Sequence, residues 1–304
     1  MIRYSKLENK PRIFKSLTGL TPPAFLELLE KFIYAYEESE RKREEKRKTP
    51  RRRQRGGGRK ATIGTMADKL LFILFYFRFY PTQEALGFFF GFGQPQANEW
   101  VHRLTQVLNT ALGYDQQLPA RHPADVEQIL AECPGLEFII DGTERPIQRP
   151  KNQKRQKEYY SGKKKRHTVK NIVISEKSSG KVKALGSTCE GKKHDKLAAD
   201  EEQYRFPEGS NIWKDTGFQG YEPPNTTTHQ PRKKPKGGEL TQEEKDQNRK
   251  ISQERIYVEH SIGGVKVFRI IRDIFRNHKP HYDDLVMETA CGLHNLRVDY
   301  RYAA

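Results

Sequence analysis

The stretch LEFIIDGTERPI, residues 136–147, decides the fold of the C-terminal part of the chain. Its short apolar run Phe138-Ile-Ile is typical of a buried strand, and the run ends at Asp141. An acid at the C-terminal end of such a strand is exposed at a sheet edge, where α/β proteins place their sites. The stretch therefore predicts a strand that carries Asp141 to a functional edge.

Two further acids stand in comparable contexts. Asp215 follows the run Ile212-Trp-Lys within the strand predicted over 211–218. Glu259 lies in the sequence YVEH near the start of a predicted helix. Hard cations such as Mg²⁺ prefer carboxylate oxygens, and a pair of ions about 3.5–4 Å apart can activate a water or a 3′-hydroxyl. The three acids predict a divalent-metal site if they converge. Each acid alone has an ordinary alternative, because Asp141 and Asp215 could cap turns and Glu259 could be a surface charge.

From about residue 120 the chain reads as an α/β domain with a mixed sheet, because predicted strands and helices follow one another. Residues 221–250 are polar and rich in Pro, Lys and Gly, which predicts a loop excursion. The predicted strands are 136–141, 167–174, 181–186 and 211–218, and the predicted helices are 194–202, 255–275 and 282–298.

The N-terminal part reads as helical. A helix is predicted over 18–38, with Thr21 as its cap, and it is followed by a basic linker that we expect to lie along phosphates. Helices over 65–80, over 82–90 and from residue 94 onward, with a Gly91-Phe-Gly turn before the last, predict a helix-turn-helix. An ordinary helical bundle with a tight turn is the alternative. The predicted DNA contacts are Arg51, Arg52, Arg53 and Arg55 in the linker and Gln94, Gln96, Asn98, His102 and Arg103 on the last helix.

The charge balance points to a polyanionic partner. The 304 residues include 56 Lys and Arg against 39 Asp and Glu, so the formal net charge is +17. Nucleic acid is the first candidate and an anionic membrane surface is the second, while a solvated basic surface is the alternative. The most apolar stretch, 70–80, is interrupted by Arg78 and is far short of the roughly 20 residues that cross a bilayer. We therefore expect no membrane span and, since the N-terminus is not a signal peptide, a cytoplasmic or nucleoid location.

The three cysteines, at 133, 189 and 291, form no CxxC pair, so a disulfide framework or a four-ligand zinc site is not favoured. Cys189 with His194 could be half of a metal site, but no second half is visible. Buried structural cysteines are the preferred interpretation.

Several charged residues fit a DNA-cutting site. Arg255, Glu259 and Lys266 are spaced by four and seven residues and share one helix face, although a surface ion pair is the alternative. Gly263 and Gly264 disfavour that helix, and close approach of a DNA backbone could explain them. His194-Asp195 either caps a helix or contacts DNA. Lys163, Lys164 and Lys165 precede a predicted strand and could bind phosphates.

The motifs IIDGTERPI, IWKDTGFQGY and RIYVEHSIGGVKVFR resemble those of DDE transposases of the insertion-sequence-five group, related to Harbinger transposases. The resemblance covers most of the chain. It implies a ribonuclease-H-like domain with Asp141 on the first strand, Asp215 on the fourth and Glu259 on a following helix. It also implies two Mg²⁺ or Mn²⁺ ions, cleavage at terminal inverted repeats, and strand transfer by the freed 3′-hydroxyl. In the family pattern of Tyr, Arg, Glu and Lys, Ser252 replaces the Tyr, whereas Arg255, Glu259 and Lys266 match.

These observations predict an N-terminal helix and linker (1–60), a helix-turn-helix domain (61–119) and a ribonuclease-H-like mixed-sheet catalytic domain (120–304). The expected function is a DNA transposase that works at least as a homodimer, with DNA of the inverted repeats and of the target as its partner. A transposase-derived DNA-binding protein without cleavage activity is the alternative, and a nuclease without strand transfer is a third possibility.

Overall fold

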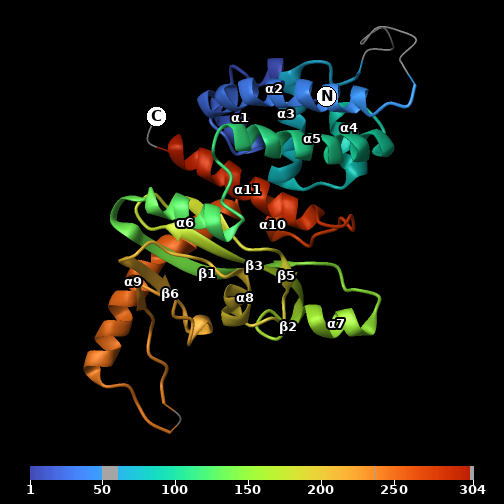
Figure 1. The fold of residues 1–304 in the computed structure, drawn as a ribbon. Helices are drawn as coiled ribbons and strands as arrows, with labels where there is room; N and C mark the ends of the chain where they lie inside the picture. The colour runs from blue at the N-terminus through green and yellow to red at the C-terminus, as the bar shows by residue number, and fades with distance from the viewer. Residues whose placement is uncertain (50–60, 236, 302–304) are drawn as a thin grey trace. The chain divides into compact units, whose positions relative to one another are not determined.

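The chain folds into two compact units, and the first boundary between them along the sequence follows residue 118 (Figure 1). The computed structural model describes residues 1–49, 61–235 and 237–301, and within these ranges the side chains of 255–259 lie outside the description. The first unit is Met1–Leu118 with Val267–Ile270 and Leu285–Ala304, and the second is Pro119–Lys266 with Ile271–Asp284. The division falls next to the predicted start of the sheet domain. The described residues before 50 form one unit with the helix-turn-helix, and most of the C-terminal helix joins them.

Helices build the first unit, and local sequence explains where they begin. The hydroxyl of Thr65 accepts a hydrogen bond from Asp68 N, and that of Thr82 accepts one from Ala85 N, so each threonine satisfies an otherwise unpaired N–H of a first turn. Gly91 closes the helix before the turn at φ 86°, which suits glycine. The helices, after a 3₁₀ turn η1 (Tyr4–Lys6), are α1 (Pro11–Thr18), α2 (Pro22–Glu45), α3 (Met66–Phe79), α4 (Gln83–Phe90) and α5 (Gln94–Tyr114).

The helix predicted over 18–38 is displaced. Thr18 ends α1, Gly19 follows at φ 81°, and α2 starts only at Pro22. The helix then runs on to Glu45, where Glu–Lys and Glu–Arg pairs at i,i+4 spacing line its surface. All residues of α3 from Asp68 to Phe77 are buried, and from Leu70 to Phe77 they are apolar or aromatic. The helix is therefore covered on every side and forms the centre of this unit.

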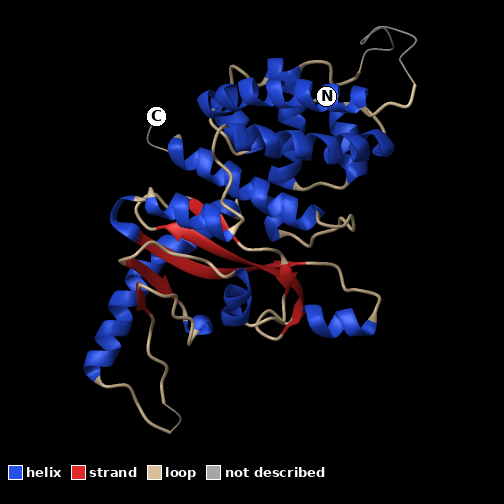
Figure 2. Ribbon diagram, viewed as in Figure 1, coloured by secondary structure: helices blue, strands red, loops and turns tan. Residues whose placement is uncertain are grey.

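A mixed sheet, shown in red in Figure 2, organises the second unit. The strand β1 pairs antiparallel with β3, which pairs antiparallel with β4, whereas β6 is parallel to β1 and β7 is parallel to β6. This topology is consistent with a ribonuclease-H-like fold, as predicted. The strands are β1 (Glu137–Pro146), β2 (Tyr160–Ser161), β3 (Arg166–Glu176), β4 (Val182–Leu185), β5 (Cys189–Glu190), β6 (Ser210–Lys214) and β7 (Thr226–His229).

Apolar clusters lie on both faces of this sheet. On one face Ile140 of β1 packs with residues of α6 and α8, including Leu130 and Ala199. On the other face Ile139 packs with Trp213 of β6 and with Ile251 and Ile262 of α9. Successive strand residues point to opposite faces, so β1 is buried on both. The helical elements after residue 118 are α6 (Pro123–Ala131), η2 (Pro134–Leu136), α7 (Gln153–Tyr159), α8 (Asp195–Glu202), η3 (Thr216–Phe218), α9 (Gln242–Val265), α10 (Arg269–Arg272) and α11 (Tyr282–Asp299).

The predicted loop over 221–250 is wrong at both ends. It contains β7, and α9 begins at Gln242 because Thr241 and Glu244 form a reciprocal capping box. The same helix ends at Val265, so the predicted helix 255–275 is in fact the second half of α9 followed by α10. The strand predicted over 211–218 stops at Lys214, where η3 takes over. The helix predicted over 282–298 is confirmed as α11, and at Gly292 it packs closely on Leu112 and Leu118.

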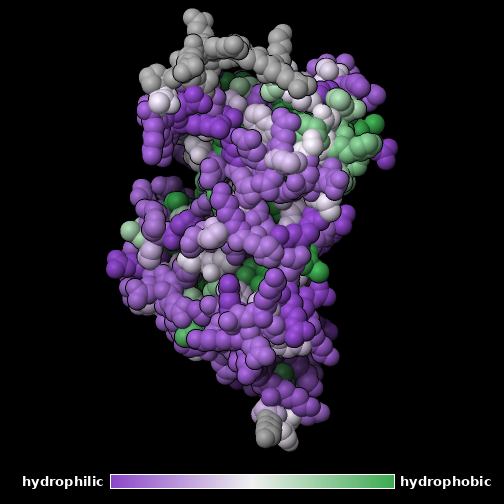
Figure 3. Space-filling view, turned by 90° about the vertical axis from the view of Figure 1, so that its right-hand side faces the viewer, coloured by the Kyte–Doolittle hydropathy of each residue, from purple (hydrophilic) through white to green (hydrophobic). Residues whose placement is uncertain are grey.

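The surface seen in Figure 3 is largely hydrophilic, in keeping with a mean hydropathy of −0.90. Within the described ranges, none of the helices has the length and apolar character that crossing a bilayer requires. Cys133 and Cys291 are buried as expected, and Cys189 is half-buried.

Candidate functional site

The parallel pairing of β1 with β6 ends one residue before Asp141 on the one strand and one residue before Asp215 on the other. The pairing of β1 with β6 runs from Glu137↔Asn211 to Ile140↔Lys214. Adjacent strands lie about 4.8 Å apart, so the next residue of each strand, an aspartate in both cases, stands beside the other. The structure thus brings together two acids that are 74 residues apart in the sequence.

Both aspartates belong to the sheet face that α9 covers. Ile139 and Trp213 are paired in register and pack against α9. Asp141 and Asp215 come two residues later on each strand, and the backbone of Asp215 is still extended (φ −86°, ψ 175°). Because side chains alternate with period two, both carboxylates are on the face of α9, the helix that carries Glu259.

The side chains of Glu259 and Arg255 lie outside the described residues, although their backbone belongs to α9. Lys266, seven residues after Glu259, is the C-cap of this helix and is half-buried. Burial lowers the pKa of Lys266 from its ordinary value, and neighbouring Lys164 lowers it further, while Asp141 and Glu144 act in the opposite direction. The end of α9 is therefore electrostatically coupled to Asp141. Ser252, at the family's Tyr position, is exposed on α9.

Short local hydrogen bonds orient the two aspartates. Asp141 Oδ1 accepts the N–H of Gly142 at 2.8 Å, and Asp215 Oδ1 accepts that of Gly217 at 2.7 Å. Each carboxylate is thereby fixed by the backbone that follows it. Two carboxylates fixed side by side supply the hard oxygen ligands that Mg²⁺ and Mn²⁺ take.

A third acid, Asp195, lies against the same backbone and was not among the predicted site residues. A Cβ on Gly142 would stand 2.6 Å from Asp195 Oδ1, and a Cβ on Gly217 would stand 2.7 Å from Asp195 Oδ2 and 2.8 Å from Asp215 Oδ1. Lys170, only 5% exposed, forms an ion pair with Asp195 at 2.7 Å. The sequence signal was the His194-Asp195 pair at a helix start, which suggested either a cap or a DNA contact. His194 is the N-cap residue of α8 but forms no side-chain cap hydrogen bond.

Among the described residues, no three His, Cys, Asp or Glu side chains are grouped closely enough to bind a metal ion. Glu259 is not covered by this statement, because its side chain lies outside the described residues. The donor set nevertheless fits a divalent cation, since Asp141 and Asp215 supply carboxylates from neighbouring strands and α9 packs against both strands. The residues that would hold the cations are therefore Asp141, Asp215 and Glu259.

Lys163, Lys164 and Lys165 are exposed in the turn between β2 and β3. Lys164 is near enough to Lys266 to depress its pKa. This lysine cluster therefore borders the end of α9 near Asp141, and among the described residues its ammonium groups have no carboxylate partner.

The predicted recognition residues start the helix α5. Gln94 is exposed, and its amide donates to Gln83 Oε1 at 2.8 Å, as does that of Asn98 at 2.9 Å. Gln96 and His102 are half-buried. These two amide contacts tie α4 to α5 across the turn.

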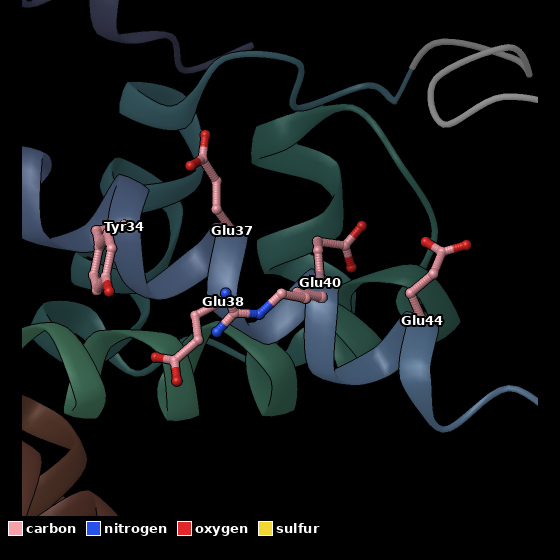
Figure 4. A pocket seen from close by; sticks show the side chains of 6 residues that line it. Tyr34, Glu37, Glu38, Glu40 and Glu44 are labelled. Atoms are coloured by element: carbon pink, nitrogen blue, oxygen red, sulfur yellow. The ribbon is translucent and has the colours of Figure 1, made fainter.

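Arg103 has structural contacts of its own. Its guanidinium forms an ion pair with Glu40 at 2.5 Å and stacks on Tyr36 at 4.5 Å and Trp100 at 5.2 Å. Glu40 belongs to an acidic row on α2, formed with Glu37, Glu38 and Glu44 (Figure 4). Arg103 thus joins α5 to α2, which gives this predicted DNA contact a structural role in the free protein. Arg51, Arg52, Arg53 and Arg55 lie outside the described residues.

Comparison with known proteins gives the site a family context. Residues 140–295 match a family described as DDE superfamily endonuclease, and residues 65–113 match the helix-turn-helix of DDE superfamily endonuclease. The chain is 27% identical, over 289 residues, to a protein of Microchaete diplosiphon described as a probable transposase for insertion sequence element IS702. That alignment covers 94% of this chain and 95% of the relative. No solved structure matches the chain.

Proposed function

The chain belongs to the DDE superfamily endonucleases, and we propose that it is a DNA transposase that cuts and joins DNA with Asp141, Asp215 and Glu259. The observation that carries this proposal is the register that sets Asp141 beside Asp215 on the face covered by α9. The similarity to a probable transposase along nearly the whole chain supports the same reading. Membership of the insertion-sequence-five group stays a prediction.

Asp141 and Asp215 would hold two Mg²⁺ or Mn²⁺ ions, with Glu259 as the third ligand. When bound, such cations activate an attacking oxygen and stabilise the leaving oxygen of a phosphodiester. The backbone N–H groups of Gly142 and Gly217 keep the two aspartates oriented before substrate arrives. This preorganisation reduces the reorganisation needed in the reaction itself.

Cationic side chains around the acids would hold the DNA strand. Lys266, whose pKa Asp141 influences, would bind a phosphate next to the cut bond, and Lys163, Lys164 and Lys165 would bind phosphates further along. Arg255 shares the helix face of Lys266 by its spacing, and we propose the same role for it.

The helix-turn-helix would recognise the terminal inverted repeats. Its second helix α5 would enter the major groove with its N-terminal residues Gln94, Gln96, Asn98 and His102 near the bases. The linker residues Arg51, Arg52, Arg53 and Arg55 would bind phosphates. Because two ends must be held together for joining, we propose a dimer or larger assembly on DNA, acting on chromosomal DNA in the cytoplasm.

A cleavage and joining assay tests the proposal. The substrate is a duplex that carries one end of the element encoding the chain, incubated with Mg²⁺ and a target plasmid. We expect the wild-type protein to cut and join this end, and Asp141→Asn to bind it equally well without cutting. Asp125→Asn, an exposed acid on α6, is the control. Cutting by Asp141→Asn at the wild-type rate contradicts the assignment, and binding without any cutting by the wild type identifies a DNA-binding factor.

A further inference from the structure

The carboxylate of Asp195 lies behind the two proposed catalytic aspartates. It approaches from α8, whose alanines pack on the sheet face opposite α9. Gly142, directly after Asp141, and Gly217, two residues after Asp215, each present bare backbone to it. A side chain at either glycine would stand less than 3.0 Å from the carboxylate oxygens, a separation that real Cβ atoms essentially never show. The carboxylate thus fills the space that these two glycines leave.

A buried cation fixes this carboxylate. Lys170 on β3 pairs with Asp195 Oδ1 at 2.7 Å and donates to the carbonyl of Lys193 at 2.6 Å. Lys193 precedes α8 by two residues, so one ammonium holds both the start of the helix and its first acid. A buried ion pair of this kind specifies one geometry, because moving either partner leaves a charge uncompensated.

We infer that Asp195 is a positioning residue, which sets the spacing of Asp141 and Asp215 for divalent cations without being a ligand itself. It acts through the backbone of Gly142 and Gly217, whose N–H groups orient the two aspartates. Groups behind metal ligands commonly change metal affinity about 10–100-fold when altered. This inference rests on the proposed function of Asp141 and Asp215.

Binding of Mn²⁺ to the full-length protein, measured by calorimetry without DNA, tests the role. Asp195→Asn keeps the shape and removes the charge, and we expect it to weaken Mn²⁺ binding about 10-fold. Because it also leaves the buried Lys170 without its carboxylate partner, we expect its melting temperature to fall. Asp200→Asn is the matched control, because Asp200 lies on the same helix and pairs with Lys196 at the surface. Gly142→Ala, whose added Cβ would stand 2.6 Å from Asp195 Oδ1 and would have only atoms of the Asp195 carboxylate as its nearest neighbours, should weaken binding as well.

Each outcome decides between the claims. Wild-type affinity in both Asp195→Asn and Gly142→Ala overturns the positioning role, and so does an equal loss in Asp200→Asn. If Asp195→Asn fails to fold, the Gly142→Ala result decides alone. A wild-type protein that binds no Mn²⁺ contradicts the proposed function instead, so the two failures are distinguishable.

An independent observation concerns a basic groove within the second unit. It is a hollow of about 1150 Å³ between the segment after β1, the helix α7 and the loop before α11. Two hydrogen bonds join the segments that surround it. Phe275 N donates to Pro146 O at 2.8 Å, and the buried Arg145 donates to Asp283 O at 2.9 Å. The cationic residues that line it are Arg149, Lys151, Arg155 and Lys279, and two histidines, His278 and His281, lie among them.

The four Lys and Arg side chains that line this groove outnumber its two acids, Asp283 and Asp284. Asp284 is bound by Arg121 at 2.6 Å and by the backbone N–H of Thr188 at 2.9 Å. Within the described residues, none of the exposed Arg149, Lys151 and Lys279 is paired with a carboxylate. The groove therefore offers a row of cations to a polyanion.

The groove also begins where the strand that carries Asp141 ends. β1 carries Asp141 and ends at Pro146, and the groove begins at the next residue, Ile147. At about 3.3 Å per residue this is about 20 Å from Asp141, or about six base pairs of duplex. We propose that the groove binds the phosphate backbone of duplex DNA about six base pairs from the bond that is cut, which again rests on the proposed function.

Salt-dependent binding of duplex DNA to the full-length protein, followed by fluorescence anisotropy without metal, tests this site. The triple variant Arg149→Gln, Arg155→Gln, Lys279→Gln should flatten the plot of log affinity against log salt by about 0.9 for each lost phosphate contact. The control Lys157→Gln changes an exposed cation of α7 that does not line the groove. The triple variant should lose its deficit on duplexes trimmed to fewer than about six base pairs beside the cut.

A triple variant with the wild-type salt slope overturns the groove, as does an equal change in Lys157→Gln. A slope change that persists on the trimmed duplexes overturns the placement beside the cut. If the wild type never cuts DNA but the triple variant shows the altered slope, the proposed function fails and the groove remains a DNA-binding site.

Discussion

Asp141 and Asp215 are neighbours because β1 and β6 run parallel and their pairing ends one residue before each of them. Parallel strands bring their carboxyl ends to the same edge, so the pair is a consequence of topology rather than of proximity in sequence. The face covered by α9 then follows from the period of a strand. This relationship makes the position of the carboxylate oxygens, and not only their charge, the quantity to test.

Lengthening either acid by one methylene should therefore abolish function. We expect Asp141→Glu and Asp215→Glu to reduce cleavage at least about 100-fold, because a displacement of about 1 Å at a reacting centre has effects of this size. Binding of the DNA end should be unchanged. Asp200→Glu, on the surface of α8, is the control, and near-normal cleavage by both site variants would show that their geometry is not catalytic.

Gly263 offers a test of DNA approach. It lies one turn after Glu259 inside α9, is exposed, and a Cβ added to it would meet nothing within 4 Å. Gly263→Ala should stabilise the free protein by about 0.5–1 kcal/mol through helix propensity and chain entropy. We expect the same variant to cut DNA more slowly, because the added methyl group faces the substrate. Chemical denaturation and the cleavage assay together check this, and faster or equal cleavage contradicts a close DNA backbone.

Arg103 should matter for stability and not for sequence preference. Its ion pair with Glu40 is largely shielded, with side-chain exposures of 17% and 13%. Arg103→Ala removes the charge-assisted hydrogen bond to Glu40, and we expect a loss of about 2 kcal/mol in denaturation of the full chain. Gln106→Ala, an exposed change on the same helix, is the control. An unchanged stability with an altered binding preference would instead return Arg103 to the recognition surface.

Cys189 should be an unreactive thiol. Burial raises its pKa to about 11, more than the neighbouring Lys193 and Lys170 lower it. At pH 8 only about one molecule in a thousand carries the thiolate, so alkylation should be at least about 100-fold slower than in the denatured chain. The rate should rise as pH approaches 11. Peptide mass spectrometry after iodoacetamide treatment measures it, and labelling of Cys189 in the folded chain at the denatured-chain rate contradicts the burial.

The sequence predicted the elements that carry their own local signals. The helices that begin near Thr65 and Thr82, the Gly91 turn, the strand that bears Asp141 and the strand that leads to Asp215 all depend on residues within a few positions of one another. The capping box at Thr241 was such a signal, but it lay inside a polar stretch that favoured a loop. The lesson is that capping chemistry outweighs average polarity in setting where α9 begins.

The rest depended on contacts between distant residues. The role of Arg103 is decided by Glu40, 63 positions away, and that of Asp195 by Lys170 on β3 and by two glycines, one on β1 and one in η3. No local pattern distinguishes a helix-capping Asp195 from one that supports a site. The strand β7 was missed because it is a short edge strand of threonines, whose pairing with β6 and not its composition makes it a strand.

The most direct test of the convergence of the three acids is the position of Mn²⁺ in crystals of the full-length protein, located by anomalous diffraction. The account predicts Mn²⁺ at the ends of β1 and β6 with carboxylate oxygens of Asp141, Asp215 and Glu259 as ligands at about 2.0–2.2 Å. Mn²⁺ absent from this edge, or Glu259 directed away from the two aspartates in an ordered helix, would contradict it.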